Sequence, residues 1–392
     1  MRIGFDVSQT GRRKAGCGYL ADGLIRALAE TDSENDYILY PAVGDLYWDP
    51  ECASETFQTG RANFRRMAPP ANWEASQSFW REPPPDLEKQ LGEPDIFHAN
   101  NFFCPTGLTR ARLVYTLYDL AFLEEPAWTT EANRCGCFEG VFRASLLAEF
   151  IIAISQNTRR HFLETFPHYP PERMEVVYPA SRFEGRQPQT EPVRDLRPQG
   201  FWLSAATLEP RKNHRRLIEA YAKLAAEATP SLPLVLAGGA GWLMEDLDRA
   251  LGEHRAGGEV IRTGYVSDAQ LEWLYENCFA FVYPSLFEGF GMPVLEAMGL
   301  GAPVICSNTT SLPEITGPAA LLVDPTDVES IAAAMKELAS SETTRERLRE
   351  EGRRRARDFS WAISAERVVE VYRRVSLLPE GARRAGGGRR LP

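Results

Sequence analysis

The chain has 392 residues, of which 44% are hydrophobic and 25% are charged, and its formal net charge is −10. This length predicts two to three domains, and the composition excludes a disordered or fibrous protein. The net negative charge argues against nucleic acid as a partner, because neutralising phosphates needs a surplus of Lys and Arg. No apolar run is long enough to span a bilayer, no signal-peptide pattern opens the chain, and seven cysteines are scattered along it. We therefore expect a cytoplasmic protein with free thiols.

Residues 1–180 alternate between predicted strands and helices. Helical spacing predicts helices at Tyr19–Glu30, Gly140–Glu149 and Gln156–Phe166, the last of them capped by Ser155. The proline-rich stretch 69–85, which contains Trp73 and Trp80, is expected to be mostly loop. Apolar runs predict strands at Arg2–Val7, Tyr37–Tyr40, Ile96–Ala99, Arg112–Leu117, Phe150–Ile154 and Val176–Tyr178. This alternation predicts an α/β domain built on a parallel sheet.

A second α/β domain is predicted at 201–360, after a proline-containing linker at 181–200. Its predicted strands are 201–205, 234–237, 260–263, 280–284, 303–306 and 320–323, and its predicted helices are 213–227, 243–254, 268–276, 293–300 and 327–339. An amphipathic helix at about 361–376 follows, and the Gly- and Arg-rich tail 381–392 is expected to be disordered. Two doubly wound, Rossmann-like domains would face each other across a cleft, with ligands at the carboxyl ends of the strands.

The strongest chemical signal is the string from Ser285 to Met298, which follows an apolar strand and opens a helix. Gly289 and Gly291 allow a ligand to approach the backbone closely. The first helical turn, with Pro293, is suited to binding a phosphate. Glu288 and Glu296 flank this turn, and a carboxylate can accept two hydrogen bonds from a sugar diol. Phosphate between two sugars describes a nucleotide sugar.

Two further motifs follow the first strand of each domain. Arg211 and Lys212, in the string Glu-Pro-Arg-Lys-Asn, are adjacent cations that can neutralise a diphosphate leaving group. Gly16 and Gly18 do not form a dinucleotide-binding fingerprint, but they can offer backbone N–H groups to the cleft. Asp246 and Asp248 have the spacing of a metal-binding pair, yet they lie in a polar helical run, so we interpret them as a solvated face and expect no metal.

Taken together, these strings resemble glycosyltransferase family 4, the retaining enzymes of the GT-B fold. The resemblance covers most of the chain and rests on Glu288 and Glu296, with Gly-Phe-Gly-Met-Pro between them. It implies that Glu288 contacts the donor sugar, that Glu296 contacts the ribose, and that Lys212 and Arg211 hold the diphosphate. It also implies backbone N–H contacts from Phe290, Gly291 and Met292 to the sugar and from Val294 and Leu295 to the phosphates. Gly264–Val266 would line the base pocket, and the final helix would cross back onto the first domain.

The chain departs from the family pattern at two positions. Many members carry an arginine where this chain has Ala206, so Arg211 would have to take its place. Many also carry a histidine in the first domain where this chain has Tyr118, a poor base near neutral pH. Asp119 and His98 are then the nearest polar candidates for a catalytic role, although His98 equally fits a buried core residue.

The resemblance implies a metal-independent hexosyltransferase with a nucleotide-sugar co-substrate and no bound cofactor. Similarity to bacterial mannosyltransferases of the group 1 glycosyltransferases favours GDP-mannose, with UDP- and dTDP-sugars as alternatives. The expected acceptor is a glycan or lipid-linked glycan of polysaccharide or lipopolysaccharide synthesis. A sugar-nucleotide epimerase, a phosphorylase or a non-catalytic binding subunit on the same scaffold remains an alternative. The basic clusters at 12–14 and 61–66 leave open a peripheral contact with the inner face of the membrane.

Overall fold

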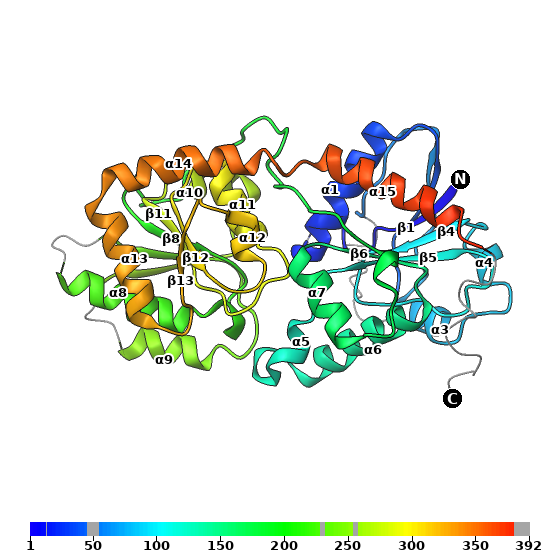
Figure 1. Ribbon diagram of the computed structural model, residues 1–392, viewed down its shortest axis with the longest axis horizontal. Helices are drawn as coiled ribbons and strands as arrows, with labels where there is room; N and C mark the ends of the chain where they lie inside the picture. Colours follow the sequence, from blue (N-terminus) through cyan, green and yellow to red (C-terminus); the bar gives the residue numbers. More distant parts are fainter. Residues whose placement is uncertain (13, 45–54, 228–231, 254–257, 380–392) are drawn as a thin grey trace. The chain divides into compact units, whose positions relative to one another are not determined.

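The computed structural model describes residues 1–12, 14–44, 55–227, 232–253 and 258–379 (Figure 1). The chain forms two compact units. The first contains Met1–Leu123, Ala132–Ala180 and the residues from Ser360 onward, and the second contains Glu124–Glu131 and Ser181–Phe359. Two assignments thus differ from the sequence analysis: 124–131 lies in the second unit, and 181–200 is part of that unit. The predicted tail at 381–392 lies outside the described residues.

The first unit is built on a seven-stranded parallel sheet in the order β3-β2-β1-β4-β5-β6-β7. Most of its strands match the predicted ones within two residues. The exception is β3, which was not predicted because two of its three residues are arginines. The strands are β1 (Arg2–Asp6), β2 (Asp36–Tyr40), β3 (Phe64–Arg66), β4 (Ile96–Ala99), β5 (Arg112–Leu117), β6 (Phe150–Ala153) and β7 (Met174–Val176).

Alternate residues of these strands are buried on opposite faces of the sheet. On β2, Tyr37 and Leu39 pack with the side chains of α1 (Gly16–Thr31) and α15 (Trp361–Ser376). Ile38 and Tyr40 pack on the other face with α3 (Trp73–Arg81), α6 (Glu131–Leu147) and α7 (Gln156–Thr165). Short helices α4 (Leu87–Gln90) and α5 (Ala121–Glu124) complete this part of the chain. Figure 1 shows α15, in red, lying along α1, in blue.

Two predictions for the first unit were wrong. The stretch expected to be loop contains α3, which Asn72 caps by accepting a hydrogen bond from the Ala75 N–H at 2.8 Å. Its Trp80 is a buried core residue rather than part of an exposed surface. Helix α6 begins nine residues earlier than predicted, since its first half is too polar and glycine-rich to show a clear helical period.

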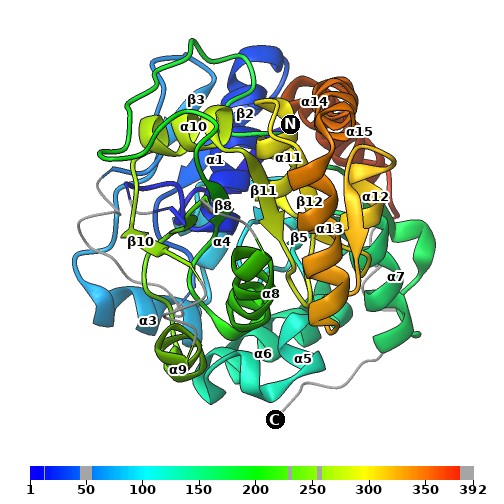
Figure 2. The ribbon, with the colours of Figure 1, turned by 90° about the vertical axis from the view of Figure 1, so that its left-hand side faces the viewer.

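The second unit has a six-stranded parallel sheet in the order β10-β9-β8-β11-β12-β13. Helices α8, α9 and α13 lie on one side of it, and α10, α11 and α14 on the other (Figures 1 and 2). The strands are β8 (Trp202–Ala205), β9 (Leu234–Ala237), β10 (Val260–Gly264), β11 (Ala280–Tyr283), β12 (Val304–Ser307) and β13 (Leu321–Val323). The helices are α8 (His214–Glu227), α9 (Glu245–Glu253), α10 (Asp268–Asn277), α11 (Met292–Gly299), α12 (Leu312–Thr316), α13 (Val328–Ser340) and α14 (Glu342–Ala356).

Helix α14 was not predicted, because its highly charged sequence carries little apolar periodicity. Within the described residues, no helix combines the length and the apolar character that crossing a bilayer requires.

Close backbone packing in the first unit gives a test of the fold. A Cβ atom on Gly140 of α6 would lie 1.5 Å from the carbonyl oxygen of Phe102, so Gly140→Ala should force the helix away from this loop. We expect a loss of about 1–3 kcal/mol of stability, seen as a lower melting temperature. Gly252→Ala in α9, where nothing lies within 4 Å of the new Cβ, is the control and should be neutral or slightly stabilising.

Candidate functional site

The loop between β11 and α11 has the strand–loop–helix form that the sequence predicted. Gly291 precedes the helix with a φ of 106°, in the left-handed region that favours glycine. A Cβ at this position would also lie 2.5 Å from Leu312 Cδ2. Pro293 occupies the first turn, where its missing N–H costs nothing. Backbone geometry and packing therefore both require glycine at position 291.

Glu288 is the centre of a buried charged cluster in this loop. Its Oε1 accepts hydrogen bonds from Lys212 Nζ at 2.7 Å, Ser285 Oγ at 2.6 Å and the Tyr283 hydroxyl at 2.9 Å. Its Oε2 accepts from Arg211 at 3.2 Å. Burial would raise the pKa of this carboxyl, but Lys212 and Arg211 outweigh it and lower the pKa to about 2. Glu288 is therefore ionised at neutral pH although it is almost inaccessible to solvent.

The turn that carries the two cations is tied to the glutamate loop by further contacts. Arg211 donates to Glu209 Oε1 at 2.6 Å and to the carbonyl oxygen of Phe287 at 2.6 Å. Asn213, which has a φ of 60°, donates from its side chain to the carbonyl oxygen of Pro284 at 2.9 Å. The structure thus brings Glu288, Lys212 and Arg211 together in one cluster, and it adds Glu209, which the sequence analysis did not single out. Two carboxylates balance two cations.

Glu296 lies within α11 and has different partners. It is fully buried, its Oε1 accepts from Arg182 Nε at 2.7 Å, and its Oε2 accepts from the Tyr275 hydroxyl at 3.2 Å. Burial raises its pKa, although Arg182 and Tyr275 lower it. Arg182 also pairs with Asp268 at 3.3 Å. The sequence analysis missed Arg182, because it lies in a stretch interpreted as linker.

The backbone N–H groups at the start of α11 make hydrogen bonds within the protein. The N–H groups of Val294 and Leu295 both donate to the carbonyl oxygen of Gly291, at 3.0 and 3.2 Å. These hydrogen bonds belong to the first turn of α11, and the contact of the two N–H groups with phosphates stays a prediction. Phe290 is buried, with its ring against that of Phe359, and Met292 is the first residue of the helix.

Two other segments of the second unit lie close to residues of the Glu288 and Glu296 clusters. Val266 is half-buried and follows β10, two residues before the Asp268 that Arg182 contacts. The segment 124–131 places the ring of Trp128 6.3 Å from that of Phe287, next to Glu288 in the chain. The carbonyl oxygen of Trp128 accepts a hydrogen bond from the indole of Trp242 at 2.7 Å.

His98, a predicted catalytic candidate, is a core residue of the first unit. It is fully buried, and its ring nitrogens lie 2.6 Å from the Tyr372 hydroxyl and 2.8 Å from Thr116 Oγ1. Thr116 donates its own proton to Asn100, so Nε2 of His98 carries the proton and Nδ1 accepts from Tyr372. Burial lowers the pKa of His98 to about 3. Because both nitrogens are occupied and no proton is gained near neutral pH, the structure gives His98 a structural role.

The other candidates of the first unit follow the carboxyl ends of its strands. Asp119, just after β5, is partly exposed and accepts from the Ala121 N–H at 3.1 Å. Gly16 and Gly18 lie in the first turn of α1 rather than in a preceding turn, and a Cβ on Gly18 would lie 2.1 Å from the carbonyl oxygen of Gln9. Gly18 therefore has a packing role, and its contact with a donor stays a prediction.

The sequence analysis also missed Asp6, at the end of β1. Its carboxylate accepts from the N–H groups of Ser8 at 2.9 Å and Asn100 at 3.2 Å. Burial raises the pKa of Asp6 to about 6, against these hydrogen bonds. An acidic residue ending the first strand was visible in the sequence, but nothing there distinguished it from a surface residue.

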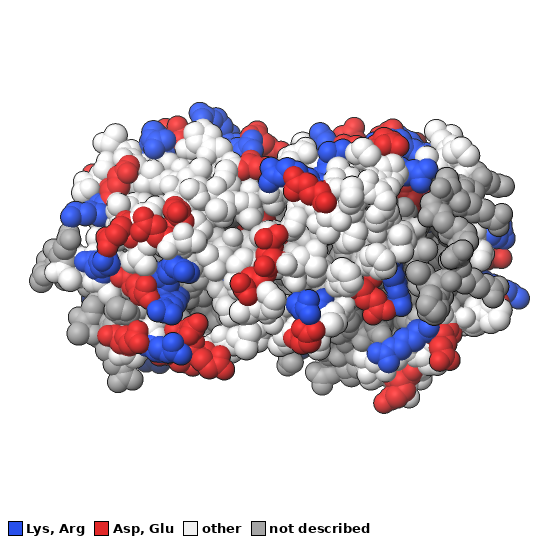
Figure 3. Space-filling model, turned by 60° about the horizontal axis from the view of Figure 1, so that its bottom comes forward, with Lys and Arg blue, Asp and Glu red and all other residues white. Residues whose placement is uncertain are grey.

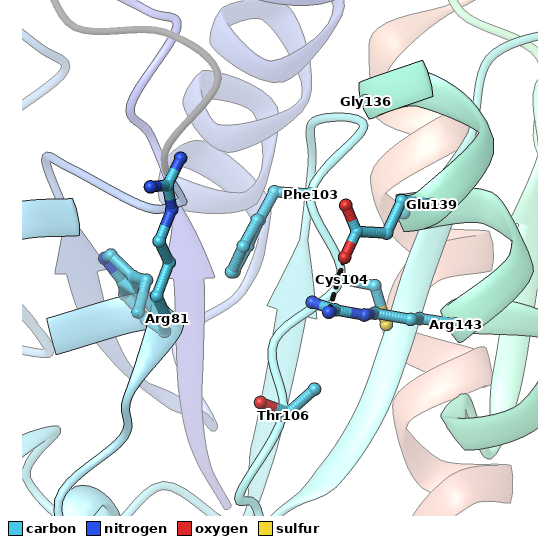
Figure 4. A pocket seen from close by; sticks show the side chains of 9 residues that line it. Arg81, Phe103, Cys104, Thr106, Gly136, Glu139 and Arg143 are labelled. Carbon is cyan, nitrogen blue, oxygen red and sulfur yellow. Dashed lines mark ion pairs between the residues drawn. The ribbon is translucent and has the colours of Figure 1, made fainter. Parts of the chain in front are cut away.

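A cavity of about 350 Å³ lies in the first unit between α3, α6 and the loop after β4 (Figure 4). Glu139 and Arg143 of α6 pair at 2.5 Å on one side of it, and Arg81 lies on the other. None of the predicted site residues is among those that line it.

Some residues of the two basic clusters make contacts within the first unit: Arg65 donates to the carbonyl oxygen of Gly92 at 3.2 Å and Arg66 to Thr56 Oγ1 at 3.2 Å, while the paired side chain of Arg12 stays 79% exposed. Arg12 pairs with Glu55 at 2.8 Å, and Lys14 donates to backbone carbonyls of its own turn. Arg13 lies outside the described residues. Figure 3 shows acidic and basic side chains interspersed on the face that it draws.

In the described ranges, no group of His, Cys, Asp and Glu side chains has the arrangement to hold a metal ion.

Comparisons with known proteins identify the family. The model of the family described as "Glycosyl transferases group 1" matches residues 193–355. The O-antigen chain mannosyltransferase B of Escherichia coli is 36% identical over 285 residues, which cover 71% of this chain and 74% of that protein. The chain belongs to the group 1 glycosyltransferases. The serotype-specific mannosyltransferase WbdA of Escherichia coli is 35% identical over 250 residues, but the match spans only 30% of that longer protein.

The fold agrees with this family. A sucrose-phosphate synthase from Thermosynechococcus elongatus superimposes with a TM-score of 0.71 at 19% identity, over 95% of this chain and 98% of that one. The two parallel sheets covered by helices are thus those of a GT-B glycosyltransferase, as the resemblance implied.

The low pKa of Glu288 predicts a pH-dependent stability. The ordinary pKa of 4.5 falls to about 2 on folding, so this carboxylate stabilises the fold above pH 4.5 and loses that contribution as the pH falls toward 2. Glu288→Gln should therefore have a lower melting temperature than the wild type at pH 7. The difference between the two melting temperatures should become smaller between about pH 5 and pH 3. A difference that stays constant with pH would contradict the assignment. Glu329→Gln, in an exposed pair with Lys223, is the control.

The role of His98 is tested through its partner. Tyr372→Phe removes the hydroxyl that donates to Nδ1 and leaves a buried acceptor unpaired, which should cost about 1–3 kcal/mol of stability. We expect a lower melting temperature and an unchanged kcat for glycosyl transfer below that temperature. A large fall in kcat without a change in melting temperature would instead give this pair a part in the reaction. Leu377→Ala, on a side chain that is 83% exposed, should change neither quantity.

Proposed function

We propose that this chain transfers mannose from GDP-mannose to a glycan or lipid-linked glycan acceptor in the synthesis of a bacterial O-antigen or related polysaccharide, with retention of anomeric configuration. The cluster of Glu288, Lys212 and Arg211 carries this proposal. The named activities of the Escherichia coli relatives support mannose as the sugar and an O-antigen chain as the product. UDP- and dTDP-sugars are the alternative donors.

In the proposed reaction, the bond between the anomeric carbon and the diphosphate breaks, an acceptor hydroxyl forms the new bond, and its proton passes to the departing diphosphate. Negative charge builds on the departing diphosphate while the sugar becomes oxocarbenium-like. Lys212 and Arg211 would stabilise that charge, since both are cations held in place before the donor arrives. Glu288 would accept hydrogen bonds from the sugar hydroxyls. No step of this scheme calls for a metal ion or a bound cofactor.

The cluster is arranged so that the cations can exchange one anionic partner for another. In this structure they pair with Glu288 and Glu209. A diphosphate would compete for the same charges and would free lone pairs of Glu288 for the sugar. Since the acceptor is expected to be lipid-linked, we also propose that the protein acts at the inner face of the membrane through a peripheral contact.

The donor is tested by thermal unfolding with GDP-mannose, UDP-glucose and dTDP-glucose, followed by a transfer assay with the best of them. A donor at 100 times its dissociation constant should stabilise the protein by about 2.7 kcal/mol. Lys212→Ala should reduce kcat by roughly a hundredfold, the usual cost of losing one charge-stabilising contact. Lys223→Ala is the control, because that lysine lies in an exposed pair. If no nucleotide sugar stabilises the protein, the proposal is wrong; release of a modified sugar without an acceptor would favour the epimerase alternative.

A further inference from the structure

The stretch 181–200 is anchored along α10 rather than suspended between domains. The N–H of Glu191 donates to the carbonyl oxygen of Ala269 at 3.1 Å, and the N–H of Gln199 donates to that of Asn277 at 2.7 Å. The N–H of Gln189 donates to the side chain of Glu272 at 3.2 Å. These contacts hold both the middle and the end of the stretch, so the side chains at its start have a defined place in the second unit.

Arg182, the second residue of this stretch, contacts the predicted ribose-binding residue Glu296. Its side chain is only 13% exposed, and it lies between two carboxylates, with Nε on Glu296 and an NH group on Asp268. Glu296 itself has no exposed surface. Burying a carboxylate is costly unless a positive charge and hydrogen bonds compensate it. Arg182 supplies that charge, and the Tyr275 hydroxyl supplies the second hydrogen bond.

We propose that Arg182 is the positioning residue of the donor site, holding the Glu296 carboxylate in the orientation that binds the ribose hydroxyls of the nucleotide. This inference rests on the proposed function and extends it to a residue for which the family motifs assign no role. A carboxylate has about four lone-pair sites. Arg182 and Tyr275 each hydrogen-bond one oxygen of Glu296, so both oxygens of the carboxylate are held in place and each keeps a further lone-pair site. Because Glu296 is fully buried in this structure, a ribose diol would have to displace the groups that cover it.

The charges around Glu296 set the direction in which the loss of Arg182 would shift its pKa. Arg182 faces it from the anchored stretch, and Tyr275 and Asp268 face it from α10. Arg186 lies one step further away, 3.7 Å from Asp268. Burial already raises the pKa of Glu296 with Arg182 in place, and the negative charge of Asp268 acts in the same direction. Without Arg182 the carboxyl would bind its proton more tightly and lose acceptor sites for the ribose.

The experiment compares Arg182→Gln, Arg182→Lys and the matched control Arg186→Gln, which removes a neighbouring arginine that pairs with Asp268 alone. The nucleoside diphosphate that most stabilises the wild type is titrated in two forms, intact and 2′,3′-dideoxy, from pH 6 to pH 9. We expect Arg182→Gln to weaken binding of the intact form by about tenfold at pH 6.5, the value of a hydrogen bond to a charged group. Any loss should be smaller at the high end of this range, because removing Arg182 raises the pKa of Glu296 further.

Binding of the dideoxy form should be the same in the wild type and in Arg182→Gln. Arg182→Lys should restore part of the affinity, and Arg186→Gln should behave as the wild type. Equal losses for the intact and dideoxy nucleotides, or no loss at all, would each overturn the role of Arg182. A wild type that binds none of the nucleotides would instead refute the proposed function, so the two failures are distinguishable. Melting temperatures without nucleotide identify any variant that fails to fold.

Discussion

The candidate site depends on one buried balance of charge. Glu288 and Glu209 face Arg211 and Lys212 with little solvent access, and the two cations lower the pKa of Glu288 to about 2. Such clusters contribute little to stability when complete, but they are costly to break. Their value is that the charges are fixed before any ligand binds, so little reorganisation is needed when negative charge develops.

The two motif glutamates reach their positions by different means. Glu288 accepts hydrogen bonds from residues near it in the chain, including Tyr283 and Ser285, and its pKa is lowered to about 2. Glu296 depends on an arginine more than one hundred residues away in the chain, and burial still raises its pKa. The pKa of the carboxyl is therefore shifted in opposite directions at the two glutamates of this motif. Two cations lower it at Glu288, whereas at Glu296 Arg182 alone counters the effect of burial with a positive charge.

Sequence reasoning recovered what local pattern determines. Buried strands such as Ile96–Ala99 and Arg112–Leu117 were predicted to the residue, and Glu288 and Lys212 were found from motifs at strand ends. It failed where long-range packing decides. His98 lies on the face of β4 that α15 covers, and only the fold brings Tyr372 to its ring. Arg182 was missed for the same reason, since a linker-like sequence carries no sign of what its side chains will contact.

The order in which the chain visits its two units has a practical consequence. It leaves the first unit after Leu123, returns at Ala132, leaves again at Ala180 and comes back at Ser360. Neither unit is therefore one continuous piece of polypeptide. A chimera that joins two relatives at a single point near residue 180 would pair Trp128 and α15 with foreign surfaces. Exchange of a whole unit requires the short 124–131 excursion and the final helix to travel with their own partners.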